Sequence, residues 1–92
     1  MIASFADREA ELIYDGGRSR RYAGLEKAIG RKLYALESAI ALHDLTVPPG
    51  NRLEALKADR AGQYSIRVNK QYRICFRWEG SHAYKVEIVD YH

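Results

Sequence analysis

Apolar residues recur at helical spacing in the first half of the chain. Leu25, Ile29, Leu33, Leu36 and Ile40 are separated by four, four, three and four positions. This spacing places them on one face of a helix with about 3.6 residues per turn. The consecutive prolines in VPPGN cannot continue a helix. We therefore expect an amphipathic helix that begins near Leu25 and includes Ile40.

The residues before this helix predict two shorter elements. IASF, at positions 2–5, is a candidate opening strand. DREAELIYDGG is typical of a short helix, with Ser4 or Asp7 near its start and Gly16 and Gly17 at its end.

After Pro49 the apolar period changes to two, which is typical of strands. RLEAL is a short candidate strand, and YSIRV, YRICFRW and AYKVEIVDYH are three more, joined by the short polar loops NKQ and EGSH. The chain therefore predicts a single α+β domain over residues 1–92. In it, two N-terminal helices pack on one face of a small, mainly antiparallel sheet.

The same alternation places arginines on the other face of the sheet. If Ile66 and Ile74 face the helices, then Arg67, Arg73 and Arg77 share the opposite face. Like charges directly opposite one another destabilise a sheet, so this cluster needs an explanation. Glu54 and Glu87 could form ladders of ion pairs with the arginines on a solvated face. Alternatively, the arginines line a concavity that binds phosphate groups, and we favour this interpretation.

Composition and charge predict where the protein resides and which kind of partner it binds. The chain has 92 residues, of which 47% are hydrophobic and 29% charged, and its net charge is +3. The single Cys75 excludes an internal disulfide, and we find neither a secretory signal nor an apolar run that could span a membrane. We expect a cytoplasmic protein without membrane contact. Basic residues concentrate at 18–32 and 52–85, which suggests a polyanionic partner.

The chain ends with three polar residues directly after a predicted strand. Strand parity places Tyr91 on the arginine face, while Asp90 falls on the opposite side and His92 follows. The histidines are scattered and the glycines lack the setting of a phosphate-binding loop, so we expect no metal and no cofactor.

RNA cleavage by the neighbouring 2′-hydroxyl suits such a set of residues. It requires that the phosphate is oriented, that charge on its oxygens is stabilised and that two protons are moved. Arginines meet the first two needs. An imidazole, with an ordinary pKa of about 6.5, suits the third, and a tyrosine ring can stack on a base.

Two long stretches resemble a known family. GNRLEALKADRAGQYSIRVNKQYRICFRW, followed by the terminal VEIVDYH, is similar to HigB, the toxin of the HigBA systems in the RelE/ParE superfamily. The resemblance extends over nearly the whole chain, from MIASF onward. It implies a RelE-like fold and a ribosome-dependent, metal-independent endoribonuclease that cuts translated mRNA in the decoding region. It also implies a HigA-type helix-turn-helix antitoxin, through which alone the toxin would associate with operator DNA.

The resemblance also implies roles for individual residues. Lys57 and Arg73 would contact the scissile phosphate, and Asp90, Tyr91 and His92 would position the nucleotide and move protons.

The chain departs from some relatives at two positions. Glu54 stands where some have a histidine, and Asn69 where some have an arginine. Arg67 and Lys70 flank Asn69, and we expect both, together with Arg77, to bind RNA.

Two other functions remain open from the sequence. A ParE-like toxin would have the same fold and would inhibit DNA gyrase by binding, without RNA chemistry. A degenerate member of the family would bind only its antitoxin or RNA. The set of Arg73, Asp90, Tyr91 and His92 favours the nuclease, because inhibition of gyrase does not need it.

Overall fold

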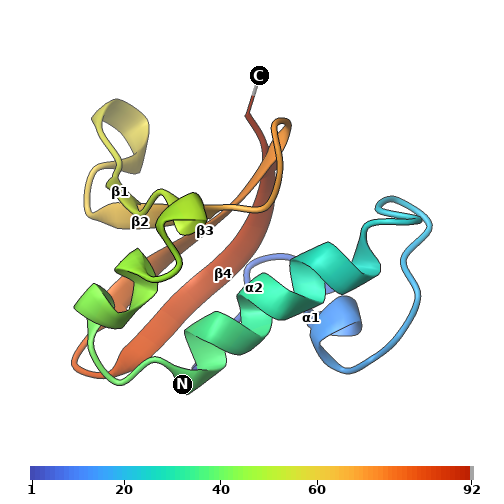
Figure 1. The fold of residues 1–92 in the computed structure, drawn as a ribbon, viewed down its shortest axis with the longest axis horizontal. Coiled ribbons are helices and arrows are strands. Elements are labelled where there is room, and N and C mark those ends of the chain that lie inside the picture. The colour runs from blue at the N-terminus through green and yellow to red at the C-terminus, as the bar shows by residue number, and fades with distance from the viewer. Residues whose placement is uncertain (92) are drawn as a thin grey trace.

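The computed structural model describes residues 1–91 and shows two helices followed by a four-stranded antiparallel sheet (Figure 1). The helices are α1 (Arg8–Tyr14) and α2 (Glu26–Ser38). The strands are β1 (Glu54–Ala55), β2 (Gln63–Arg67), β3 (Tyr72–Glu79) and β4 (His82–Asp90), and they lie in this order across the sheet. Three short 3-10 helices, η1 (Leu42–Thr46), η2 (Pro49–Asn51) and η3 (Ala58–Arg60), connect them.

Helix α1 begins where its capping residue predicts. The Asp7 carboxylate accepts the backbone N–H groups of Glu9 (2.9 Å) and Ala10 (3.4 Å), which otherwise lack a partner in the first turn. Its second oxygen accepts the N–H of Ile88 at 3.1 Å, so the cap also joins α1 to β4. The helix is followed by Gly16, whose φ of +88° favours glycine.

Helix α2 is shorter than the apolar spacing predicts. Leu33 and Leu36 are fully buried, but the helix ends at Ser38, and Ile40 is 74% exposed. The expectation that Ile40 belongs to the helix is therefore wrong. The N–H groups of Ile40 and Ala41 both donate to the Asp44 carboxylate at 3.0 Å, so this segment caps η1 instead of continuing α2. No helix within residues 1–91 is long and apolar enough to cross a membrane.

The predicted strand at residues 2–5 forms only isolated parallel bridges. Ile2 pairs with Ala83 and Phe5 with Val86, beside β4. The predicted strand RLEAL is likewise reduced to the two residues of β1.

A single buried cluster joins the helices to the sheet. Ile66, Ile74 and Ile88 lie in register across β2, β3 and β4, and they belong to the same buried cluster as Ile29 and Leu33 of α2. Helices α1 and α2 pack against each other and against β4. The residues that alternate with this buried row are therefore presented on the opposite face of β2 and β3.

Candidate phosphate-binding site

An open cleft of about 320 Å³ lies between the β2–β3 loop, the end of β4 and residue 52. We call it the cationic cleft; it is lined by Arg52, Arg67, Asn69, Lys70, Arg73 and Tyr91. Four of these six side chains carry a positive charge and none is acidic. Such a site favours an anion.

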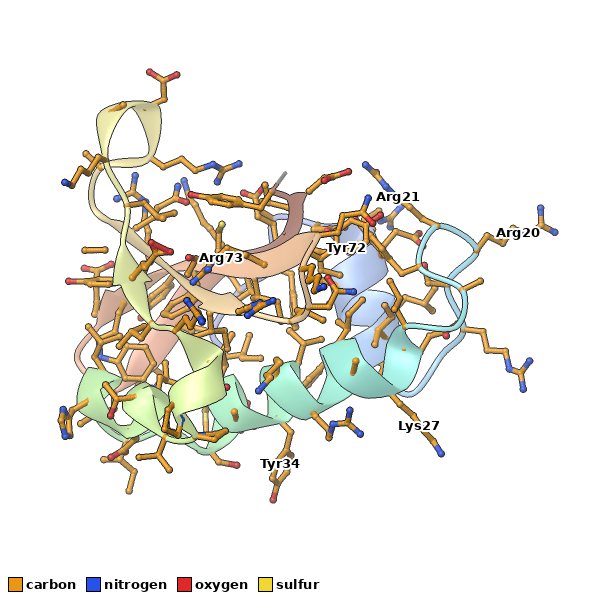
Figure 2. The ribbon with its side chains drawn as sticks, turned by 45° about the horizontal axis from the view of Figure 1, so that its top comes forward. Arg20, Arg21, Lys27, Tyr34, Tyr72 and Arg73 are labelled. Carbon is orange, nitrogen blue, oxygen red and sulfur yellow. The ribbon has the colours of Figure 1, made fainter. Side chains whose placement is uncertain are left out.

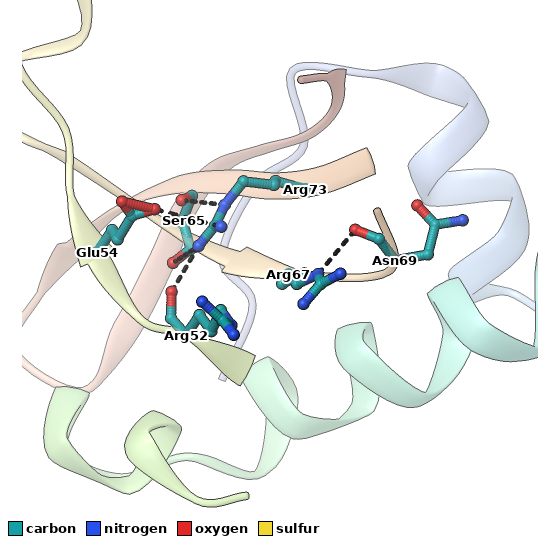
Figure 3. A network of polar contacts seen from close by, with 6 residues as sticks. All are labelled: Arg52, Glu54, Ser65, Arg67, Asn69 and Arg73. Atoms are coloured by element: carbon teal, nitrogen blue, oxygen red, sulfur yellow. Dashed lines mark hydrogen bonds and ion pairs between the residues drawn. The ribbon is translucent and has the colours of Figure 1, made fainter. Parts of the chain in front are cut away.

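Two arginines of the cleft lie directly opposite each other on neighbouring strands. Arg67 of β2 pairs in register with Arg73 of β3. Side chains at such positions are about 5 Å apart, so two positive charges there repel each other. Arg67 donates from Nε to the backbone oxygen of Asn69 at 3.1 Å. Arg73 turns the other way, toward β1 (Figure 3).

Arg73 is held by a network that uses most of its guanidinium. Nε donates to Ser65 Oγ at 2.8 Å, and Nη2 donates to the backbone oxygens of Ser65 (3.5 Å) and Arg52. Nη1 lies 3.2 Å from a carboxylate oxygen of Glu54. The side chain of Arg73 is only 10% exposed, so these contacts replace the water it loses.

The small side chain of Ser65 makes this arrangement possible. Ser65 is fully buried and lies between Glu54 of β1 and Cys75 of β3 in the pairing of the strands. Arg73 passes over it to reach β1, as Figure 3 shows. A serine at this position leaves room for the arginine and also provides it with an acceptor.

Tyr91 covers the other side of Arg73. The Arg73 Cζ lies 5.6 Å from the centre of the tyrosine ring, a distance typical of a cation–π contact. The Tyr91 N–H donates to the backbone oxygen of Gln71 at 2.6 Å, and this bond joins the end of the chain to the β2–β3 loop. Strand parity therefore placed Tyr91 correctly beside the arginines.

Asn69 shapes the loop that presents Lys70. Its side-chain oxygen accepts the N–H groups of Gln71 (2.9 Å) and Tyr72 (2.7 Å). Asparagine commonly stabilises turns in this way. Lys70 is exposed and lines the cleft.

Arg52 lines the cleft although no sequence pattern predicts it there. It follows η2 in the left-handed conformation, with φ 45° and ψ 58°. The preceding Asn51 is fully buried, donates to the backbone oxygens of Leu45 (3.1 Å) and Val47 (3.2 Å), and accepts from Lys32 Nζ. The position of Arg52 depends on these contacts of the buried Asn51, one of which comes from the distant Lys32, so no local pattern identifies it.

Several predicted site residues do not line the cleft. Lys57 is exposed just before η3, and Arg77 is exposed farther along β3, opposite Gln63 and Tyr84. Asp90 pairs in register with Tyr72 and accepts from Gln71 Nε2 at 3.1 Å. His92 lies outside the described residues.

The two glutamates of this sheet face pair with different arginines. Glu54 pairs with Arg73, and Glu87 lies 3.4 Å from Arg60, which also donates to Gln63 at 3.0 Å. Ion pairs and a cationic cleft therefore coexist on this face.

Beside these residues, Cys75 is a buried free thiol, and loss of solvation raises its pKa above the ordinary value of about 9. It is therefore protonated near neutral pH and a poor nucleophile.

The first basic block of the sequence lies apart from the cationic cleft. Arg20 and Lys27 point outward near the connection between α1 and α2, away from Arg73 (Figure 2). They line a separate hollow together with Gly16, Ser19 and their neighbours. Among residues 1–91, no group of three His, Cys, Asp or Glu side chains is arranged to hold a metal ion.

Several solved structures share the fold of this protein. A YoeB–YefM complex from Staphylococcus aureus matches with a TM-score of 0.61 at 18% identity, covering 100% of this chain and 98% of the other. YafQ from E. coli matches with a TM-score of 0.61 at 8% identity, covering 98% and 93%. These likenesses show a shared fold.

The sequence comparisons identify the family. Residues 3–92 match the RelE-like toxin of the type II toxin-antitoxin system HigB. Toxin HigB-1 of Vibrio cholerae serotype O1 is 44% identical over 80 residues, or 85% of this chain and 84% of that protein. Endoribonuclease HigB of Proteus vulgaris is 30% identical over 93 residues, covering both chains completely. The chain belongs to the family of HigB-like toxins.

Proposed function

We propose that the protein is a ribosome-dependent endoribonuclease that cleaves translated mRNA without a metal and thereby inhibits translation. The observation that carries this proposal is the cationic cleft, in which four cations and one aromatic ring surround a space free of acidic side chains. Arginine and aromatic side chains are the groups that hold RNA phosphates and bases. The Proteus vulgaris relative, an endoribonuclease by name, supports the same reaction.

In the proposed reaction the RNA provides its own nucleophile. The 2′-oxygen attacks the adjacent phosphorus, the bond to the 5′-oxygen breaks, and a cyclic phosphate and a 5′-hydroxyl are formed. Arg52, Arg67 and Lys70 hold the phosphate, and the buried charge of Arg73 stabilises the negative charge that develops on its oxygens. The ring of Tyr91 stacks on a base.

Further roles in the reaction belong to residues 90–92 and to two exposed cations. Asp90, Tyr91 and His92 position the nucleotide and transfer the two protons, one from the 2′-hydroxyl and one to the 5′-oxygen. Lys57 and Arg77 are exposed outside the cationic cleft, where they contact the RNA that extends from it. Lysines and arginines in such positions hold the backbone without selecting a sequence.

The proposed partner is a HigA-type antitoxin with a helix-turn-helix domain. A solved YoeB–YefM toxin–antitoxin complex from Staphylococcus aureus has the same fold, which supports the binding of an antitoxin by this fold. We propose that the toxin acts in the cytoplasm, on mRNA in the decoding region of the ribosome. It would approach operator DNA only through the antitoxin.

The experiment that tests this function maps the 5′ ends of mRNA in a translating extract. We expect cleavage within codons and 5′-hydroxyl ends, a loss of roughly 100-fold in rate for Arg67→Gln, and loss of cleavage when His92 is deleted. The matched control is Arg8→Gln, which removes one exposed arginine from α1 that does not line the cationic cleft.

Three outcomes would contradict the proposal or a part of it. Intact mRNA together with inhibited supercoiling by DNA gyrase would indicate a ParE-like activity instead. Cleavage in the absence of ribosomes at an unchanged rate would remove the proposed dependence on translation. If deletion of His92 leaves the rate unchanged, its role in proton transfer is wrong.

A further inference from the structure

Glu54 is the acidic residue that contacts the buried arginine of the site. It lies on β1, a strand of only two residues at the edge of the sheet, and one of its carboxylate oxygens is 3.2 Å from Arg73 Nη1. The two side chains differ in their access to water: Glu54 is 54% exposed and Arg73 is 10% exposed. The Glu54 carboxylate can therefore be hydrated when it leaves Arg73, whereas the Arg73 guanidinium stays buried and then needs another anion, such as a phosphate.

The hydrogen bonds of Arg73 show which part of the guanidinium remains for a ligand. Of its five N–H groups, the one on Nε and the two on Nη2 are directed at Ser65 and the Arg52 carbonyl. These acceptors are a buried hydroxyl and backbone oxygens of the fold. Nη1 is thus the nitrogen through which Arg73 can bind a phosphate, and in this structure it contacts one oxygen of the Glu54 carboxylate.

We propose that Glu54 is a resident competitor of the RNA phosphate for Arg73. A carboxylate and a phosphate both present oxygens that accept from a guanidinium, so they compete for the same N–H groups. Either the phosphate displaces Glu54 into solvent, or it binds beside a negative charge that repels it. In both cases Glu54 weakens the binding of RNA and sets the affinity of the cationic cleft. This inference rests on the proposed function.

A binding experiment without cleavage tests the role of Glu54. The 15N-labelled protein is titrated first with inorganic phosphate and then with a short all-2′-deoxy oligonucleotide, and the Nε–H resonance of Arg73 is followed by NMR. We expect Glu54→Gln to bind both ligands roughly fivefold more tightly, since it removes one negative charge within a few ångströms of the bound anion. Glu54→Asp keeps the charge on a shorter side chain and should stay closer to the wild type.

The control is Glu79→Gln, which changes the net charge by the same amount. Glu79 is exposed at the far end of β3, beside the turn to β4, and should leave the affinity unchanged. Equal affinities of Glu54→Gln and the wild type, or no response of Arg73 in either protein, would overturn the inference.

Cleavage assays separate this inference from the proposed function. If Glu54→Gln binds more tightly but neither protein cuts mRNA, the competition stands and the nuclease proposal fails. If Glu54→Gln binds no more tightly and also loses cleavage, Glu54 takes part in the reaction and does not compete with the substrate.

Discussion

At the scale of single residues, the central feature is a buried arginine whose neighbours are arranged around it. A guanidinium removed from water is tolerated only when its N–H groups find acceptors and its charge finds a partner. Ser65 and the Arg52 carbonyl supply the acceptors, and Glu54 supplies the charge. Arg73 therefore contributes a fixed positive charge to the cationic cleft, while Arg67 and Lys70 remain more accessible to a ligand.

Removal of the Ser65 hydroxyl tests this arrangement. Ser65→Ala leaves Arg73 Nε without its side-chain acceptor, and a buried hydrogen bond to a charged group contributes about 1.5–3 kcal/mol. We expect the free energy of unfolding to fall by about that amount in urea titrations, and RNA cleavage to fall with it. Ser38→Ala, at an exposed position on α2, should change stability by less than about 0.5 kcal/mol. Equal effects of the two substitutions would show that the hydroxyl is not needed.

At the scale of elements, the segment between α2 and β1 positions one wall of the cleft. η1 and η2 are too short for a long series of backbone hydrogen bonds. The buried side-chain amide of Asn51 connects them to each other, and it also joins them to α2 because it accepts from Lys32. Arg52 follows directly, with its carbonyl toward Arg73. A helix-to-strand connection thus determines the geometry of a residue on β3.

Asn51→Ala should therefore impair the site as well as the fold. It leaves two carbonyls and the Lys32 ammonium without the amide, and unsatisfied buried polar groups cost about 1–3 kcal/mol each. We expect thermal unfolding at a clearly lower temperature. At temperatures where the variant is folded, we expect weaker phosphate binding at Arg73, measured by NMR. Thr46→Ala, at an exposed residue of η1, is the control. If the Arg73 resonance of folded Asn51→Ala responds to phosphate as it does in the wild type, the position of Arg52 does not affect the cationic cleft.

At the scale of the whole molecule, charge is distributed unevenly over an otherwise ordinary protein. The net charge is only +3, yet four cations surround one cleft and a second basic group lies near the connection of α1 and α2. The local field of the cleft, and not the net charge, should govern the association with RNA.

The dependence of RNA binding on salt measures this local field. Binding to a single strand releases about 0.7 counterions per neutralised phosphate, so four cleft cations predict a slope of about −3 in log K against log salt. Arg67→Gln should make the slope shallower by about 0.7 units, whereas Arg8→Gln on α1 should leave it unchanged. A flat salt response of the wild type would exclude the cationic cleft as the binding surface.

Periodicity identified most of the fold because it reports which side of an element faces the core. The spacing of Ile29, Leu33 and Leu36 predicted α2, and alternation predicted the face of β2 and β3 that carries Arg67 and Arg73. It failed at Ile40, where local capping by Asp44 competes with apolar spacing.

The sequence by itself determined the α+β order of elements, the opposite faces of the strands and the presence of Tyr91 beside the arginines. These features depend on the periods of 3.6 and 2 that helices and strands show within a single stretch of chain. Only the tertiary structure decided that Arg52 lines the cationic cleft, that Arg77 does not, and that Glu54 pairs with Arg73. The physical reason is that these contacts join residues far apart in the chain. Their geometry depends on strand register and on the buried Asn51, which no local pattern contains.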